Sequence, residues 1–296
     1  MRAFEPLVVV SATVLVWLTP AAVMPGFTQA ADPATVLRAA RDALGGDTRI
    51  EAVRTLIVTG RTRQVRGDNL VPIEFEIQVE LPDKYSRRDE FPAQDAGPAT
   101  SGFNGDRLIQ IPPAPQPVAR AGGPPPPSPE QQEAAIRARV ATVKQDFARL
   151  MLGMFAGSST GFPLTFDYVA QAEAPEGKAD VLDVKGPANF TARLFVDAQT
   201  HLPIMVSWRA QPPPARGGGP PPARGGAGVA PAAAPSGTPP GAVENRLYFA
   251  DYRTVDGLKL PFRIRRAVGS ETTEETTFDR FRINARVDPR RFEVGN

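Results

Sequence analysis

The stretch LYFADYRTVDGLKLPFRIRR, residues 247–266, predicts a β-hairpin. Asp256 and Gly257 stand near its centre, and an Asp-Gly pair readily adopts the two positive φ angles of a two-residue hairpin turn. Because successive side chains of a strand point to opposite faces, one face of this hairpin is expected to be buried and the other to face water. The residues of the expected buried face after the turn are Leu258, Leu260, Phe262 and Ile264.

Pro261 restricts where the second strand of this hairpin can lie. Proline has no N–H to donate, so its strand lies at a sheet edge or directs that position away from a neighbouring strand. The tight turn and the alternation together favour an antiparallel sheet.

Composition limits the kind of protein that this chain can be. It has 296 residues, of which 42% are hydrophobic, so it is long enough to bury a sizeable core. Its 34 basic and 32 acidic side chains nearly balance, for a net charge of +2. Charges so evenly matched create no strong field, and nucleic acid is therefore not expected as a partner.

The chain contains no cysteine and a single histidine, His201. It can form no disulfide, and it lacks the thiol on which a bacterial lipid anchor is built. A zinc site would have to rely mainly on carboxylates. His201 lies in DAQTHLP, residues 197–203, an expected hairpin connection, and no G-x-S-x-G motif accompanies it. We therefore expect a protein that is not an enzyme, with no catalytic residue, no metal site and no cofactor.

Residues 1–31 have the pattern of a secretory signal peptide. Arg2 precedes an apolar run over residues 7–18, and small residues follow up to Ala31. The run is shorter than the roughly 20 apolar residues of a membrane span. We expect cleavage after Ala30 and export to the bacterial periplasm as a soluble monomer. The alternative is an uncleaved inner-membrane anchor at the N-terminus.

Two stretches rich in proline and glycine interrupt the remaining chain, at residues 112–129 and 211–241. Such segments bury little apolar area, so we expect them to be flexible and to lie outside the fold. We interpret them as insertions in a single domain that spans residues 32–296. A docking site for a proline-binding partner in the second insertion is the alternative.

Most of the chain between these segments has the two-residue alternation of β-strands. Their spacing and the intervening turns favour an antiparallel meander of about ten or eleven strands, which is large enough to curl. Apart from the two strands of the hairpin, the predicted strands cover residues 53–64, 71–82, 84–91, 106–112, 164–173, 178–186, 190–197, 202–210 and 274–284, with residues 290–294 as an additional candidate.

Two amphipathic helices are predicted to cover the apolar face of that sheet. The first begins at Asp32-Pro33 and ends at Gly45-Gly46. The second begins with Ser128-Pro129-Glu130-Gln131, a capping box, and continues to Met154. Charged residues on the other side of this second helix predict that this side faces water. Its apolar stripe consists of Ile136, Val140, Val143, Phe147, Leu150 and Met154.

These elements together resemble a known family. The motifs are ALGG at the end of the first helix, VRTLIVTGR, LFVDAQTHLPIMVSW, YFADYRTVDGLKLPFRI and TTFDRFRIN. They are similar to the periplasmic outer-membrane lipoprotein-sorting (LolA/LolB-like) superfamily, over most of the chain outside the insertions. The resemblance implies an unclosed half-barrel with helices in its concave side. Named members carry lipoprotein acyl chains through the periplasm, and the family includes lipid-sensing domains related to RseB; no functional residue of theirs is matched here.

We therefore predict a mainly β (α+β) fold, with a curved antiparallel sheet that forms an open half-barrel with covering helices. The predicted function is a soluble periplasmic carrier or binding protein for a lipidated or long apolar ligand, such as a lipid or lipoprotein acyl chains. Each buried methylene of such a chain contributes about 0.8 kcal/mol. The alternative is a periplasmic interaction or sensor module whose core is filled by its own side chains, with a periplasmic or outer-membrane protein as partner.

The carrier interpretation predicts an apolar lining from the second helix and the second strand of the hairpin. We expect Phe147 and Met154 to face Leu260 and Phe262, or their neighbours, across a space that a ligand fills. If the helix instead fills this space, the interaction module is favoured. The candidate lining residues are Val140, Val143, Phe147, Met154, Leu258, Leu260, Phe262 and Ile264.

Overall fold

The computed structural model describes residues 32–67, 69–92, 97–113, 126–157, 159–174, 177–210 and 241–294. The predicted signal peptide, residues 1–31, lies outside the described residues. So do most of the two predicted insertions, of which only residues 112–113, 126–129 and 241 are described.

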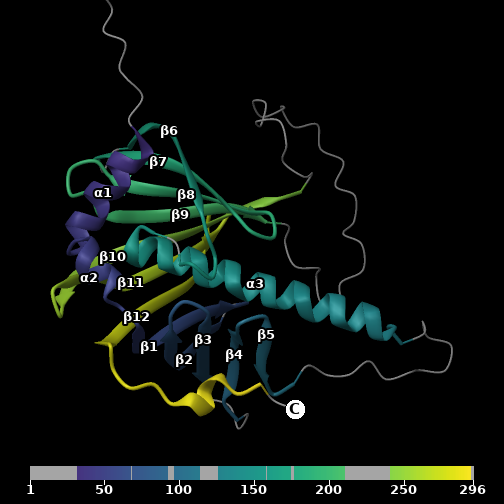
Figure 1. The fold of residues 1–296 in the computed structure, drawn as a ribbon. Coiled ribbons are helices and arrows are strands. Elements are labelled where there is room, and N and C mark those ends of the chain that lie inside the picture. The colour runs from purple at the N-terminus through teal and green to yellow at the C-terminus, as the bar shows by residue number, and fades with distance from the viewer. Residues whose placement is uncertain are drawn as a thin grey trace, which may run out of the picture. The chain divides into compact units, whose positions relative to one another are not determined.

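Twelve strands form one antiparallel sheet in the described part of the chain. The sheet is open, because its two edge strands do not pair with each other, and this confirms the predicted mainly β, half-barrel fold (Figure 1). The strands are β1 (Thr55–Arg66), β2 (Asn69–Glu80), β3 (Lys84–Glu90), β4 (Ala99–Asn104), β5 (Arg107–Ile111), β6 (Thr165–Ala174), β7 (Gly177–Gly186), β8 (Phe190–Asp197), β9 (Pro203–Ala210), β10 (Val243–Val255), β11 (Leu258–Val268) and β12 (Glu271–Ile283).

The strand order brings the two halves of the chain together. From β1 the chain runs as a meander to the edge strand β5, and from the opposite edge, β6, a second meander runs back to β12. Because β1 pairs with β12, the first and last strands lie together in the middle of the sheet. The long helix α3 (Pro129–Phe155) connects the two edges and crosses one face of the sheet (Figure 1).

The hairpin at residues 247–266 is confirmed as the pair β10 and β11. Asp256 and Gly257 have φ angles of 49° and 81°, as the tight turn requires. Pro261 lies in a central strand, so the edge alternative is wrong. Pairing of β11 with β12 starts only at Arg263, and the missing N–H of Pro261 therefore costs no ladder bond on that side.

The first predicted helix is confirmed as α1 (Pro33–Leu44). The side chain of Asp32 accepts a hydrogen bond from the N–H of Ala34 at 3.2 Å, and Gly45 ends the helix with φ 129°. A Cβ at Gly45 would lie 2.4 Å from the carbonyl oxygen of Gly257, so this glycine lets α1 pack on the hairpin turn. The helix α2 (Asp47–Glu51) follows; its five residues are too few to show a helical period in the sequence.

The second predicted helix is confirmed as α3, and so is its capping box. The N–H of Gln131 donates to Ser128 Oγ at 3.3 Å, and the N–H of Ser128 donates to Gln131 Oε1 at 2.8 Å. Residues 129–139 are exposed and extend past β5 (Figure 1). From Phe147 to Phe155 all residues but Leu150 are buried. The prediction that one side of this helix faces water is confirmed at Arg137, Arg139 and Asp146, which are exposed. Beyond Asp146 the helix lies inside the curved sheet and nearly all of its residues are buried.

Two segments differ from the predicted strands. Residues 99–104 form β4, which the sequence pattern misses because Thr100, Ser101 and Gly102 show no apolar alternation. Residues 290–294, predicted as a final strand, belong mainly to the 3-10 turn η1 (Pro289–Phe292). Proline at the start of η1, and the side chain of Asp288 before it, favour a helical turn there.

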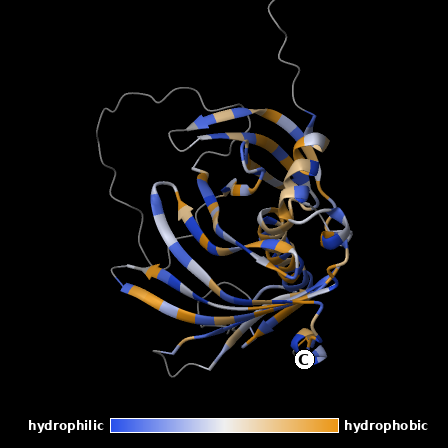
Figure 2. Cartoon of the chain, turned by 90° about the vertical axis from the view of Figure 1, so that its left-hand side faces the viewer, coloured by the Kyte–Doolittle hydropathy of each residue, from blue (hydrophilic) through white to orange (hydrophobic). Residues whose placement is uncertain are grey.

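The core lies between the helices and the face of the sheet that curves around them (Figure 2). Hydrophobic and hydrophilic residues alternate along many of the strands, as expected for a sheet with one buried face (Figure 2). Leu44 of α1, Leu152 of α3 and Leu194 of β8 are each at most 1% exposed and belong to one continuous cluster. The two helices and the sheet therefore share a single core.

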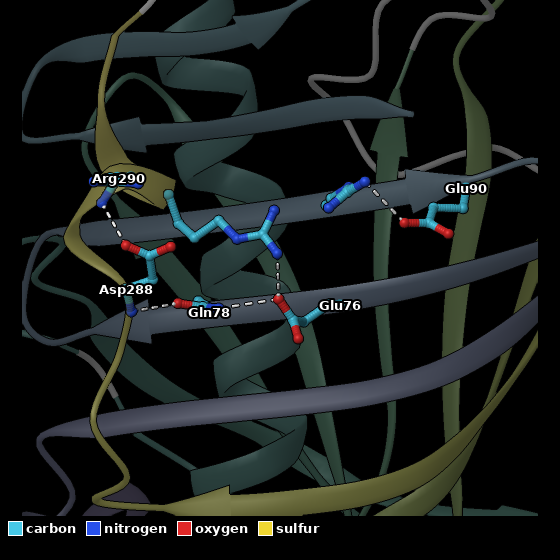
Figure 3. A network of polar contacts seen from close by, with 7 residues as sticks. Glu76, Gln78, Glu90, Asp288 and Arg290 are labelled. Carbon is cyan, nitrogen blue, oxygen red and sulfur yellow. Dashed lines mark hydrogen bonds and ion pairs between the residues drawn. The ribbon is translucent and has the colours of Figure 1, made fainter. Parts of the chain in front are cut away.

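The opposite, outer face of the sheet holds the C-terminal segment through polar contacts. The N–H of Asp288 donates to Gln78 Oε1 at 3.1 Å, and Arg291 pairs with Glu76 at 3.0 Å (Figure 3). A groove of about 530 Å³ crosses this face. All three of its arginines are paired with carboxylates, so the groove is best explained as part of this attachment. The ion pairs are Arg291–Glu76, Arg88–Glu90 and Arg61–Asp279.

Candidate ligand-binding site

The eight candidate lining residues lie in or against the core. Val143 is half-buried and packs against the core cluster, and the other seven belong to it: Val140, Phe147, Met154, Leu258, Leu260, Phe262 and Ile264. The ring of Phe147 lies 5.0 Å from that of Tyr85 and 5.6 Å from that of Phe103. Phe147 thus packs on β3 and β4, which β2, β1 and β12 separate from β11. Much of the predicted ligand space is therefore occupied by side chains of the protein.

A cavity of about 670 Å³ lies beside this packed region, at the C-terminal end of α3. We call it the apolar cavity. Side chains from α1, α2, α3, β6 and the turns that follow α2, β2 and α3 line it. Its polar members are Arg41, Glu51, Arg54, Ser159 and Thr160. Its apolar lining consists of Leu37, Ile50, Val53, Leu81, Pro82, Met151, Phe155, Ala156 and Phe166.

Local backbone features explain why a space remains there. α3 ends at Ala156, which has a left-handed φ of 46° and donates its N–H to the carbonyl of Leu152 at 3.0 Å. The chain therefore turns away from the helix axis instead of continuing across the opening. On the other side, the N–H of Val53 donates to the carbonyl of Ile50 at 3.2 Å, and this turn leads from α2 into β1. Residues of both turns, Ile50 and Val53 on one side and Ala156 on the other, line the cavity.

A second cavity, of about 350 Å³, lies under the middle of α3 and is called here the charged cavity. Two candidate lining residues, Val143 and Ile264, contribute to it. Its wall also carries five charged side chains: Arg87, Asp89, Asp146, Arg266 and Glu274. Thr62 and Thr276, whose hydroxyls are 2.9 Å apart, extend the polar region along β1 and β12.

The charges of this cavity hold each other in place. Arg87 donates from Nε to Asp89 Oδ1 at 2.7 Å. Burial disfavours the charged form of Arg87, but Asp89, Tyr85 and Glu274 together outweigh this, so the pKa of Arg87 lies above its usual value. Arg149, on the neighbouring turn of α3, pairs with Asp146 at 2.8 Å and lies 4.4 Å from the ring of Trp208. Burial lowers the pKa of Arg149 despite this carboxylate.

Chemistry distinguishes the two cavities. A hydrocarbon chain in the charged cavity would remove water from Arg87, Asp89 and Glu274, and burying a charge without new partners is costly. The apolar cavity has three charged members against nine apolar ones, so a chain can be buried there mainly against hydrocarbon. The apolar cavity is therefore the better site for a long apolar ligand.

Tyr85 is buried at the wall of the charged cavity, and we therefore expect the protein to lose stability at alkaline pH. Burial raises the pKa of Tyr85 to about 12, from a usual value near 10. Between pH 10 and 12 the unfolded chain releases this proton while the folded chain keeps it. Stability should therefore fall as pH rises, by about 2–3 kcal/mol over this window. Urea unfolding at several pH values measures it.

The control for this prediction is Tyr85→Phe, which removes the titrating hydroxyl. The variant should lose less stability between pH 10 and 12 than the wild-type protein. Some loss will remain, because burial also raises the pKa of Tyr252. Equal slopes for wild type and variant would contradict the assignment to Tyr85.

The single histidine and the acidic side chains are the groups that could serve an enzyme or a metal site in the described ranges. His201 lies exposed in the turn between β8 and β9, with φ 56°, as predicted for a turn residue. Within these ranges, no group of three or more His, Cys, Asp or Glu side chains is placed to hold a metal ion. None of the helices that the structure describes is long and apolar enough to cross a membrane.

The sequence pattern misses the residues of the apolar cavity. Leu37, Ile50, Leu81 and Phe166 are each recognisably apolar, but they come from four separate elements. The sequence signals are on the two helices: Leu37 belongs to the apolar stripe of the first predicted helix, and Met151 and Phe155 lie one residue beyond Leu150 and Met154 of the second stripe. The last two turns of α3 are buried on almost all sides, so Met151 and Phe155 also face the interior and line the cavity.

Comparison with known proteins identifies the fold. No protein-family model matches the sequence, and no curated protein matches it. The solved structure of the LolA superfamily protein NE2245 from Nitrosomonas europaea aligns with a TM-score of 0.51 at 12% identity, over 89% of this chain and 98% of that protein. A domain from Vibrio parahaemolyticus, described as an outer membrane lipoprotein-sorting protein domain, aligns with a TM-score of 0.45 at 10% identity, over 88% and 97%.

The chain is thus an open antiparallel half-barrel with helices inside its curve and an apolar cavity at one end of α3. Its fold is LolA-like, which confirms the resemblance predicted from the sequence. At this low identity the likeness concerns the fold alone.

Proposed function

We propose that this chain is a periplasmic carrier or binding protein that holds a long apolar ligand, such as a lipid or the acyl chains of a lipoprotein, in the apolar cavity. The observation that carries the proposal is the cavity itself. Its volume of about 670 Å³ lies within the roughly 300–1,000 Å³ of ligand pockets, and most of its lining is apolar.

The free energy of burying hydrocarbon is large enough to explain how the cavity would bind a long apolar ligand. Each methylene transferred from water into the cavity contributes about 0.8 kcal/mol, so a short stretch of acyl chain already provides several kcal/mol. Such binding needs shape and dryness, and no specific motif. This agrees with a sequence in which no catalytic constellation is recognisable, and we infer a role other than catalysis.

The proposed location follows from the signal-peptide pattern of residues 1–31. After its removal, residues 32–296 would act as one monomeric domain, in which the two proline-rich stretches are insertions. The LolA-like fold supports this location, since the family that the sequence resembles works in the periplasm.

The proposal is tested on protein purified from the periplasm of its own bacterium. Native mass spectrometry should detect a bound lipid, which extraction then identifies. The delipidated protein should take up cis-parinaric acid, a fluorescent fatty acid, in a saturable way. Correctly folded protein that neither retains a lipid nor takes up the probe would refute the carrier function.

One observation favours a second candidate, an interaction or sensor module. Seven of the eight candidate lining residues lie in the core cluster, as expected if the protein fills most of the curved sheet itself. In that case a protein partner would bind the surface, and the apolar cavity would be a packing defect. A folded protein with no acyl ligand would support this candidate.

A further inference from the structure

Arg54 is the one arginine at the apolar cavity whose charge is not balanced by a carboxylate in the described residues. Arg41, the other arginine of the lining, lies 2.6 Å from Asp47 and 3.3 Å from Glu51. Glu51, the one carboxylate of the described lining, is therefore paired with Arg41. Arg54 is exposed, and its guanidinium donates to the backbone carbonyl of Glu51 at 2.6 Å, a neutral acceptor.

The backbone holds Arg54 firmly at this position. Its N–H donates to Asn284 Oδ1 at 2.7 Å, and its carbonyl accepts the N–H of Leu81 at 2.8 Å. Leu81 itself lines the apolar cavity. The base of the Arg54 side chain is thus fixed beside the apolar lining, while most of its guanidinium donors remain available.

A guanidinium beside an apolar cavity matches one class of ligand. Guanidinium groups bind anionic oxygens through two parallel hydrogen bonds, and a carboxylate fits this geometry well. The apolar lining at the same site suits a hydrocarbon chain. Ser159 and Thr160, which also line the cavity, add two hydroxyl groups that can donate to an anion.

We propose that the apolar cavity selects a long-chain carboxylic acid, with its hydrocarbon among the apolar side chains and its carboxylate on Arg54. This inference rests on the proposed function and adds the class of ligand to it. Arg54 is here a specificity-determining residue, because the hydrocarbon alone would bind without it.

The test compares lauric acid with lauryl alcohol, which has the same chain and no charge. Displacement of cis-parinaric acid from delipidated wild-type protein at neutral pH and low salt gives both affinities. A charge-assisted hydrogen bond contributes enough to favour the acid by roughly tenfold. Arg54→Gln should remove this preference by weakening acid binding roughly tenfold and leaving alcohol binding unchanged. Added salt should weaken acid binding alone.

Arg282→Gln is the matched control, because Arg282 is an exposed arginine of β12 that does not line the apolar cavity. It should keep the wild-type preference. Equal affinity of the wild-type protein for acid and alcohol, or an equal loss of both in Arg54→Gln, would overturn the inference while the proposed function stands. If neither compound displaces the probe, or the probe itself does not bind, the proposed function fails and the inference with it.

Discussion

Replacing Ile50 by aspartate is expected to lower the affinity for an acyl probe by about a hundredfold or more and to leave the protein folded. Ile50 is half-buried and lines the apolar cavity from α2. A carboxylate at this position must lose water when a hydrocarbon chain binds, at a cost of several kcal/mol, and about 1.4 kcal/mol corresponds to a factor of ten. Titration with cis-parinaric acid measures the affinity, and a thermal melt measures the fold.

Two further variants make this result specific. Ile136→Asp introduces the same charge on α3, at a residue that is 49% exposed and outside the cavity, and it should bind like the wild type. Ile50→Leu preserves volume and polarity and should also bind normally. Normal binding by folded Ile50→Asp would show that the ligand lies elsewhere. An equal loss in Ile136→Asp would show a general effect of charge.

The features that follow from local sequence could be predicted well. The turn at Asp256-Gly257 and the capping box at Ser128 depend on residues at most a few positions apart, so the sequence shows all the groups involved. The same holds for the end of α1 at Gly45. The fold could be predicted because such local signals occur throughout the two meanders, β1 to β5 and β6 to β12, in which each strand pairs with the next along the chain.

The site depends on distant contacts and could not be predicted in the same way. The predicted stripe of α3 runs from Ile136 to Met154, and it is buried at Val140, Phe147 and Met154 and half-buried at Val143 and Leu150, but Ile136 is 49% exposed. The stripe also cannot show which strands the buried side meets. Phe147 packs on Tyr85 and Phe103, more than 40 residues away in sequence, and its ring is therefore enclosed. Whether a space is filled or open depends on several elements at once.

The charged cavity illustrates the same limit. Arg87 and Glu274 lie in strands whose sequences are rich in charged and polar residues, which predicts that their side chains face water. No neighbouring residue in the sequence indicates that these two side chains face inward. The inward face of β3 continues from Tyr85 to Arg87 and Asp89, so its polarity changes along a single strand. A two-residue pattern assigns residues to faces, but it cannot tell which part of a face the helix covers.

Replacing Gly153 by valine is expected to destabilise the protein by about 3 kcal/mol or more, which corresponds to roughly 10 °C in melting temperature. A Cβ at this position would lie 2.0 Å from Cζ of Phe249 and 2.2 Å from its Cε1. The ring of Phe249 is 4% exposed and has little room to move. α3 must therefore shift from β10, and the hydrogen bond at 3.0 Å from the Tyr252 hydroxyl to the Gly153 carbonyl must lengthen.

Helix propensity alone predicts a different result, which makes this change a test of the packing. An exposed glycine inside a helix is less stable than most other residues by several tenths of a kcal/mol or more, so a valine free of contacts would stabilise α3 slightly. Gly97→Val is the control, because a Cβ at Gly97 meets no atom within 4 Å, and its effect should be small.

Combining Gly153→Val with Phe249→Ala should destabilise the protein by less than the sum of the two single changes, because the smaller side chain leaves space for the valine. Additive losses would mean that the end of α3 does not pack on β10 as closely as described. A Gly153→Val protein as stable as wild type would mean the same. Met151 and Phe155, which lie on this end of α3, would then not form a fixed wall of the apolar cavity.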